Sequence, residues 1–160
     1  MKKIIILAAL ISASLLVKAQ ADIITKHNGE QLDVNFIKLE NDLIYYSLDG
    51  SREEQKISKY AVSQLTNKET KEIKKISDKV LVDSKSDYKF VTVLPQEKTV
   101  ALKQVANFSG VSTKTKGESP LANQKQTAMR IKAKSASNGY PFVSIVEKAD
   151  GKYEAVAYVY

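Results

Sequence analysis

The sequence predicts an α+β protein: a small N-terminal antiparallel β module, built as a curled sheet or open barrel, followed by an α+β domain with one main helix on a mostly antiparallel sheet. Three observations predict this fold class. Residues 22–66 consist of short alternating or β-branched runs separated by turn residues. Ser119-Pro120 and Asn138-Gly139 enclose a run of good helix formers. Further β runs lie on both sides of that helix, and 160 residues are enough to bury a core without disulfides.

Residues 1–21 have the pattern of a secretory signal peptide. Two lysines precede an uncharged apolar run over 4–17, and small residues at Ala19 and Ala21 suit signal peptidase. The run is shorter than the roughly 20 residues that cross a membrane. We expect cleavage after Ala21, with Ala19 as the alternative, and no cysteine follows that would carry a lipid anchor. The mature chain is therefore expected to be secreted or periplasmic, without a membrane span.

Residues 22–66 are expected to form four short strands. Asn28-Gly29 predicts a type I′ hairpin turn, because both residues tolerate a positive φ. The alternation that follows changes parity near Phe36, which predicts a β-bulge or a strong twist there. The remaining expected features are turns at 40–42 and 49–50, strands over 43–48 and 55–60, and a short apolar piece over 61–65. A unit this small is seldom stable alone, so we expect it to lean on the second half or on another copy.

Residues 67–84 are expected to be a linker that ends in a connecting strand over 80–83. Its first part is rich in lysine and glutamate, with Ile73 and Ile76 as the apolar points. Residues 85–160 then form the α+β domain. Its strands are expected over 88–94, 100–112, 142–147 and 153–160, with a bend at Gly110 and a turn at Asp150-Gly151.

The helix is predicted to begin after Ser119 and to end at Asn138-Gly139. An apolar arc runs along it, made by Leu121, Ala128, Met129, Ile131 and Ala136. Lys125 and Lys132 project into this arc, which leaves two interpretations open. Either the lysine stems lie across the sheet edge, or the buried direction differs by a turn. Arg130 and Lys134 lie on the opposite, polar face in both cases.

Charge is distributed unevenly along the mature chain, which carries a net +4 from 22 basic and 18 acidic side chains. Residues 22–66 hold 5 basic and 8 acidic side chains, whereas residues 67–160 hold 17 and 10. The change of sign coincides with the boundary that the β pattern predicts. Acidic and basic halves of this kind can face one another within a molecule, or order head-to-tail self-association.

The candidate binding site is the basic cluster between residues 114 and 134. Its members are Lys114, Lys116, Lys125, Arg130, Lys132 and Lys134, against Glu118 as the single acid. One interpretation is a site for an anionic partner: lipid head groups, a cell-wall polymer or an acidic envelope protein. The other is a solvated helix face. Nucleic acid is not expected, because lysines outnumber arginines 20 to 2 in the mature chain and no aromatic residue lies within the cluster.

Catalytic signatures are scarce. His27 is the single imidazole and adjoins the turn at Asn28-Gly29, where exposure is expected, so no histidine-based catalytic or metal site is predicted. Residues 86–89 match S-x-x-K, but a chain this rich in serine and lysine contains such matches by chance. No nucleotide-binding motif is present and no cofactor is expected. A pair of carboxylates for glycoside cleavage stays open, since 18 acids are available and the fold brings distant ones together.

Two parts of the chain resemble known kinds of protein. The run over 22–29, the apolar piece over 61–65 and the continuation over 76–80 resemble the opening β module of many secreted Bacteroidetes proteins of unknown function. The segment over 127–139 followed by 142–146 is similar to the helix-glycine-strand unit of small α+β envelope domains, which include YbjQ-like proteins and the Rcs stress-sensor lipoprotein. The disulfides and lipid anchor of that sensor have no counterpart in this chain. These resemblances imply a fold and a compartment and supply no active residues.

We therefore expect a non-enzymatic, exported envelope protein that binds or interacts with a partner. One alternative is a small hydrolase of a cell-wall or surface glycan that uses two carboxylates. A second alternative is a structural module of a surface assembly.

Overall fold

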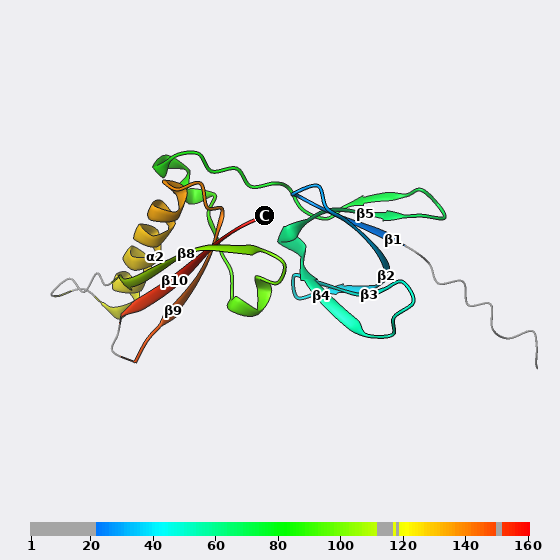
Figure 1. The fold of residues 1–160 in the computed structure, drawn as a ribbon. Helices are drawn as coiled ribbons and strands as arrows, with labels where there is room; N and C mark the ends of the chain where they lie inside the picture. Colours follow the sequence, from blue (N-terminus) through cyan, green and yellow to red (C-terminus); the bar gives the residue numbers. More distant parts are fainter. Residues whose placement is uncertain (1–21, 112–116, 118, 150–151) are drawn as a thin grey trace, which may run out of the picture.

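The computed structural model describes residues 22–111, 117, 119–149 and 152–160. The fold is α+β, as the sequence predicts: over these residues it has one α-helix and two sheets dominated by antiparallel pairs, neither of which closes into a barrel. Figure 1 shows the two sheets as two lobes joined near the centre of the molecule. The lobe formed by residues 22–75 is the β module, and the lobe formed by residues 85–160 is the helix-containing domain.

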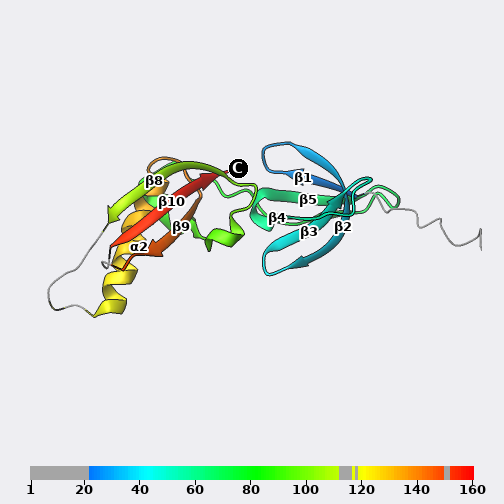
Figure 2. The same ribbon diagram turned by 60° about the horizontal axis from the view of Figure 1, so that its bottom comes forward.

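The β module is a six-stranded sheet in the order β4-β3-β2-β1-β5-β6, in which every neighbouring pair is antiparallel. Its strands are β1 (Asp22–Lys26), β2 (Gln31–Glu40), β3 (Leu43–Leu48), β4 (Glu54–Ser58), β5 (Val62–Asn67) and β6 (Ile73–Lys75), with the 3₁₀ turn η1 (Lys59–Ala61) before β5. The long strand β2 bends where the register shifts between Phe36 and Lys38, which confirms the predicted bulge. The bend lets the sheet curl, so that β3 and β4 face back toward β1 and β5 (Figure 2).

The turn chemistry of the module differs from the prediction in one respect. Gly29 has φ +91°, but Asn28 is not in the positive-φ region. The amide of Gly29 donates to Lys26 O and the amide of Lys26 donates to Glu30 O, a three-residue loop with glycine at its left-handed position rather than a type I′ turn. The type I′ pattern occurs at the β2–β3 turn, where Asn41 and Asp42 have φ of 51° and 65°.

The second lobe is a four-stranded sheet in the order β7-β9-β10-β8, with the helix α2 (Pro120–Ala136) on one face (Figure 1). The strands are β7 (Thr92–Val93), β8 (Lys103–Val111), β9 (Phe142–Glu147) and β10 (Tyr153–Val159). Every pair is antiparallel except the short parallel pair of β7 with β9. The predicted bounds of the helix and of β9 and β10 are confirmed to within two residues.

The segment between the lobes and the first strand of the second lobe were predicted wrongly. Residues 67–75 form the β5–β6 hairpin instead of a linker, and residues 80–83 form no strand. The predicted strand over 88–94 is reduced to β7, because the 3₁₀ turn η2 (Lys85–Lys89) occupies its start. Asp87 explains this turn: its Oδ2 accepts hydrogen bonds from the amides of Asp83 and Ser84 and from Ser84 Oγ at 2.9–3.1 Å. Such local side-chain bonds outweigh β propensity.

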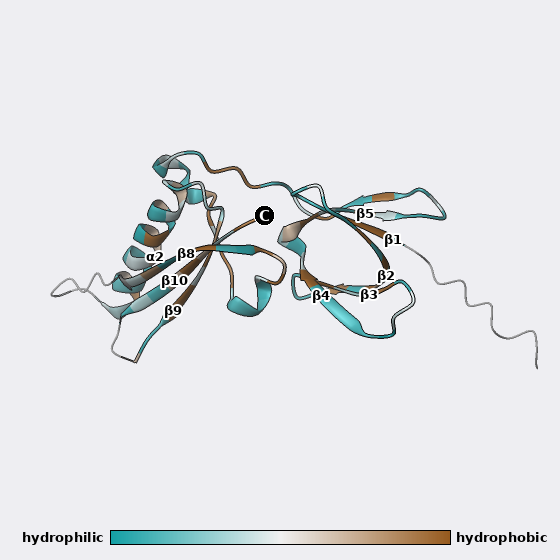
Figure 3. Ribbon diagram, in the orientation of Figure 1, coloured by the Kyte–Doolittle hydropathy of each residue, from teal (hydrophilic) through white to brown (hydrophobic). Residues whose placement is uncertain are grey.

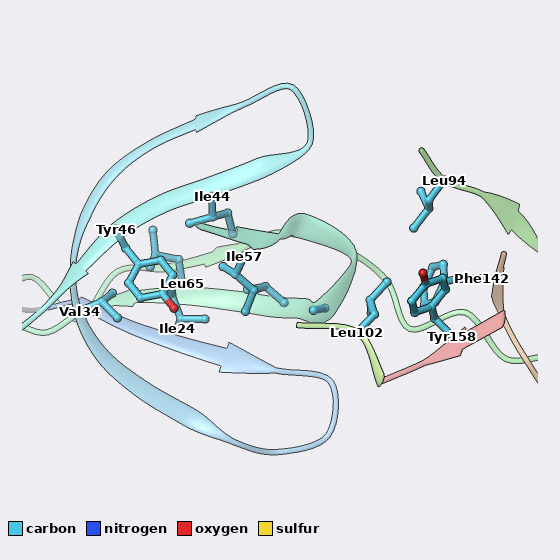
Figure 4. Packing of buried hydrophobic residues seen from close by; sticks show 12 residues of the cluster. Ile24, Val34, Ile44, Tyr46, Ile57, Leu65, Leu94, Leu102, Phe142 and Tyr158 are labelled. Atoms are coloured by element: carbon cyan, nitrogen blue, oxygen red, sulfur yellow. The ribbon is translucent and has the colours of Figure 1, made fainter. Parts of the chain in front are cut away.

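Two hydrophobic clusters hold the fold. The first fills the curled module and continues into the second lobe, where Leu94, Leu102, Phe142 and Tyr158 join it (Figure 4). The second lies between α2 and the four-stranded sheet. The junction of the lobes is also polar: the amide of Ser58 donates to Val100 O at 3.0 Å. Asp42 pairs at the same place with Lys98 of the 3₁₀ turn η3 (Gln96–Lys98) at 2.8 Å. The β module therefore packs against the second lobe and shares part of its hydrophobic core with it.

The buried stripe of α2 differs from the predicted apolar arc. Its fully buried side chains are Thr127, Ile131, Ser135 and Ala136, whereas Leu121 and Met129 are 60% and 53% exposed. Of the two interpretations, the second therefore applies: the face of α2 that is buried against the sheet differs from the predicted apolar arc. The sheet accepts small side chains because its own residues Phe108, Val143 and Tyr153 fill the space beneath the helix. Within the described residues, no helix has the length and hydropathy needed to cross a membrane.

Candidate functional site

The predicted basic cluster separates in the structure. Lys114 and Lys116 lie outside the described residues, while Lys125, Arg130, Lys132 and Lys134 lie on α2. Pro120–Ala136 contains these four cations and no acid. In Figure 3 hydrophobic and hydrophilic stretches alternate along the strands, whereas α2 is largely hydrophilic with a few hydrophobic bands. The helix therefore presents a cationic surface, whose parts face different neighbours.

A hollow with a strongly apolar lining lies between α2 and η2, and we name it the α2/η2 groove. It has a volume of about 480 Å³ and is lined by Lys85, Ser86, Tyr88, Met129, Arg130 and Ala133. A second hollow of about 260 Å³ adjoins it and adds Lys134 and Ser137. The groove and the hollow beside it thus combine an apolar lining with three cationic groups, Arg130 and Lys134 from the helix and Lys85 from η2.

The position of η2 beside α2 is fixed by contacts on both elements. The three hydrogen bonds to Asp87 hold the turn, and they lower the pKa of its carboxyl, the amide of Asp83 being the largest cause. Lys132 Nζ donates to the carbonyl of Lys89 at the end of η2, at 3.5 Å. Asp87 is thereby engaged within its own turn, and η2 is fixed against the helix.

The cations of the α2/η2 groove have no carboxylate partner among the described residues. The seven ion pairs of the described chain involve other lysines, five of them wholly within residues 22–78. Lys134 Nζ instead lies 4.7 Å from the centre of the Phe108 ring, a cation–π contact that leaves its charge uncompensated. Lys85, Arg130 and Lys134 therefore create a local positive potential that an anion can neutralise.

Lys125 lies away from this groove. It lines a different hollow, on the side of α2 that faces the edge of β9, together with Val93, Leu121 and Ile145 among others. The structure therefore brings Arg130 and Lys134 together and separates Lys125 from them. Lys85 completes the groove and was not among the predicted site residues, because it is 45 residues from Arg130 in the sequence. The positive charge of Lys85 and Lys89 is evident from the sequence, but no local pattern indicates that this segment packs beside α2.

His27 is less exposed than predicted and contacts the end of the chain. Its Nε2 lies 2.8 Å from Ser77 Oγ, and its ring centre is 4.8 Å from that of Tyr160. The Ser77 hydroxyl donates to Val62 O at 2.8 Å, so its proton is not directed at the imidazole. A serine that histidine activates as a nucleophile must donate its proton to the imidazole. The Ser77 hydroxyl donates to the backbone instead, so His27 and Ser77 do not have the geometry of a catalytic pair.

The S-x-x-K match has no nucleophile geometry in the described structure. Ser86 Oγ lies 2.6 Å from Ser84 Oγ, with which it shares a hydrogen bond. Ser84 in turn donates to Asp87. The serine is thus part of the bonding that shapes η2.

Carboxylates and metal ligands do not gather at the hollows of the described surface. The α2/η2 groove and its neighbour carry none, the hollow beside β9 carries Glu147, and a hollow over β8 and β10 carries Glu154. Among the described residues no three of histidine, cysteine, aspartate and glutamate lie close enough together to hold a metal ion. The site with the most defined chemistry on this surface is the cationic, apolar groove.

Comparison of the chain with family models, with curated proteins and with solved structures found no match.

Proposed function

We propose that the protein is a non-enzymatic, exported envelope binding protein and that its ligand is an anionic amphiphile held in the α2/η2 groove. The observation that carries the proposal is the groove itself, where Lys85 and Arg130 lack carboxylate partners among the described residues and stand beside the apolar surface of Tyr88, Met129 and Ala133. A phosphate or carboxylate neutralises the cations, and an attached apolar segment covers the lining.

The composition of the lining favours an amphiphile over the other anionic partners. A polyanionic sugar polymer offers hydroxyl groups that would lose water against Met129 and Ala133 without gaining hydrogen bonds. An alkyl or acyl segment gains free energy in the same place, at about 25 cal/mol per Å² of apolar surface buried. Envelope lipids supply this chemistry, either as a membrane surface or as free molecules, and the two sources are separable by experiment.

Export is supported by the signal-like pattern of residues 1–21. Cleavage after Ala21 would place Asp22 first in the mature chain, and β1 begins at that residue. The side chain of Asp22 is already bonded within the module: its Oδ2 accepts from the amide of Phe36, and its Oδ1 accepts from Asn67 Nδ2.

The first prediction concerns binding of decyl phosphate, a monomeric anionic amphiphile. We expect it to bind the wild-type protein in isothermal titration calorimetry. Replacement of Lys85 and Arg130 by glutamine should weaken binding by about tenfold, because two partly exposed charge-assisted contacts are lost. Added salt should weaken the wild-type affinity more than that of the variant.

Matched controls separate charge from fold and free ligand from membrane. Lys74→Gln changes an exposed lysine of β6 in the other lobe and should bind like the wild type. Neutral decyl maltoside should bind far more weakly than decyl phosphate. Vesicles of phosphatidylglycerol, compared with phosphatidylcholine, show whether the groove also engages a membrane surface. Equal affinities of the wild type and the double variant for decyl phosphate would refute the proposal, and activity on glycan substrates would support the hydrolase alternative instead.

A further inference from the structure

The edge of β9 is only partly covered by β7. The pairing consists of Thr92 with Phe142 and Val93 with Val143, after which the chain turns away at Pro95 into η3. The amides of Thr92 and Leu94 donate to Pro141 O and Val143 O, so the odd-numbered residues of β9 direct their main chain to this edge. By the two-residue period of a strand, Ile145 and Glu147 do the same. No described strand pairs with them on that side.

A hollow of about 380 Å³ runs beside this uncovered edge, and we name it the edge groove. Its walls are α2 and the sheet, and its lining consists of Val93, Leu121, Gln124, Lys125, Ala128, Ile145, Glu147 and Tyr153. Apolar side chains at its rim are unusually exposed, with Leu121 at 60% and Val93 at 44%. An apolar hollow thus lies next to the uncovered edge of β9, where the main-chain N–H and C=O groups continue beyond the β7–β9 pairing.

We propose that the edge groove binds an extended segment of a partner protein, which adds a strand to β9 and places an apolar side chain between α2 and the sheet. An extended peptide is the occupant that fits this site. Its main chain can continue the β7–β9 ladder, because its N–H and C=O groups recur every two residues and match those on the free edge of β9. Alternate side chains of such a segment point to the α2 face, where the hollow is.

Charge defines the segment further. The helix wall offers Lys125 and no acid, so a carboxylate of the bound segment is favoured next to the apolar side chain. Glu147, at the end of β9, is the one acid of the lining and is linked by a hydrogen bond to Tyr153, whose pKa is raised by burial and by that bond. A carboxylate of the bound segment is therefore favoured beside Lys125 on the helix wall and disfavoured beside Glu147 at the end of β9. The partner segment is therefore an extended peptide that combines apolar and acidic residues.

This inference is independent of the proposed function. The edge groove and the α2/η2 groove lie on different sides of α2, one lined by Ala128 and the other by Ala133. Each alanine can be enlarged without touching the other groove. Ala128→Trp and Ala133→Trp are thus reciprocal controls on one helix.

The test is selection of a random octapeptide library displayed on phage against the full mature chain, followed by titration of the enriched synthetic peptide. We expect Ala128→Trp to weaken its binding by tenfold or more and Ala133→Trp to leave it unchanged, with the reverse pattern for decyl phosphate. N-methylation along the peptide should weaken binding at every second residue, because alternate amides face β9. In the bound state the amides of Ile145 and Glu147 should exchange with solvent more slowly.

Several results would overturn the inference: no enriched peptide, equal tolerance of N-methylation at all positions, or loss of binding with Ala133→Trp instead of Ala128→Trp. Concentration-dependent self-association of the chain that Ala128→Trp abolishes would assign the edge to a second copy and would also overturn it. Circular dichroism and thermal unfolding of both variants verify that they fold. Where Ala128→Trp does not fold, Leu121→Lys, at a side chain that is mostly exposed, replaces it.

Discussion

The imidazole of His27 lies at the junction of the two lobes, between Ser77 of the connecting segment and Tyr160 at the end of the chain. Burial lowers its pKa, and the nearby charge of Lys79 acts in the same direction, while Asp78 opposes them. Lys79 also lies over the Tyr160 ring, at 5.7 Å from its centre. The ring is therefore in contact with both the imidazole of His27 and the ammonium group of Lys79. Protonation of His27 in the folded state therefore disturbs a compact set of contacts.

Stability should depend on pH through this residue. A histidine whose pKa is lower in the folded than in the unfolded state binds its proton preferentially when unfolded. The free energy of unfolding should therefore be highest above the ordinary histidine pKa of 6.5 and should fall as the pH is lowered through it. Urea unfolding at pH 7.5 and pH 5.5 measures the loss, and His27→Gln should lose less between the same two pH values. Equal losses in the wild type and in the variant would contradict this role.

Helix α2 ends in a hydrogen-bonded arrangement that depends on one glycine. The amide of Gly139 donates to Ala136 O and the amide of Tyr140 donates to Ser135 O, both at 3.0 Å, which is a Schellman motif. Gly139 has φ +73°, the left-handed conformation that this motif requires. The nearest atom to an added Cβ would be Val82 O at 3.6 Å, an ordinary contact, so strain rather than a clash sets the cost of a side chain.

Gly139→Ala should lower the free energy of unfolding by about 1 kcal/mol, because alanine is unfavourable in the left-handed region. For a chain of this length that corresponds to a decrease in Tm of roughly 2–4 °C. Gly139→Asn is the matched control and should lose less, since asparagine tolerates this conformation. Differential scanning calorimetry distinguishes them, and two variants of equal stability to the wild type would show that the glycine is not needed there.

Elements with local signals were predictable from sequence, and elements defined by distant contacts were not. Ser119, Pro120 and Gly139 mark the ends of α2 in the sequence and in the structure, since capping depends on neighbours within a turn. The stripe it buries, with Thr127 and Ser135 in place of Leu121, depends on the sheet beneath and could not be read from the helix alone. The turn η2 was not predicted, and the expected strand over 88–94 is shortened to β7 because Asp87 closes this turn at its start.

The candidate site was predictable in the same partial way. A charge count along the helix identifies Arg130 and Lys134, because the absence of acids in α2 is visible in the sequence. Lys85 and Tyr88 enter the groove only through the packing of η2 on α2, and no periodicity reports that contact. The sequence therefore indicates the two helix cations that line the hollows beside η2, and it does not indicate Lys85 or the apolar lining.

The two lobes share a core at the scale of the whole molecule. Phe142 is fully buried in the cluster that also contains Ile24 and Ile57 of the β module. Its ring is 5.9 Å from that of Tyr60 in the β module and 5.2 Å from that of Tyr160, which follows β10, so it contacts aromatic residues of both lobes. A shared core of this kind predicts that the lobes unfold together.

Phe142→Ala should destabilise the protein by about 3–5 kcal/mol and should lower the protection of both sheets. Native-state hydrogen exchange reports this residue by residue: amides of β1 and β5 should lose protection together with those of β9 and β10. Val146→Ala, on the same strand but 47% exposed, should change both little. Unaltered protection of β1 and β5 in Phe142→Ala would show instead that the module folds without the second lobe.

The arrangement of the grooves follows from this architecture. The junction occupies one end of the four-stranded sheet, through Phe142 and Tyr158, which leaves α2 and both of its flanks on the outside of the molecule. One flank carries cations beside apolar surface and the other carries a strand edge. Helix α2 thus separates two surface hollows of different chemistry.

The most direct test of ligand binding in the α2/η2 groove is the amide NMR spectrum of the mature protein titrated with decyl phosphate. We expect the largest shifts at residues 85–89 and 129–134, which form the two walls of the groove, and only small shifts in the β module. Shifts spread evenly over exposed lysines in both lobes, or centred on a surface away from α2, would contradict binding at this site.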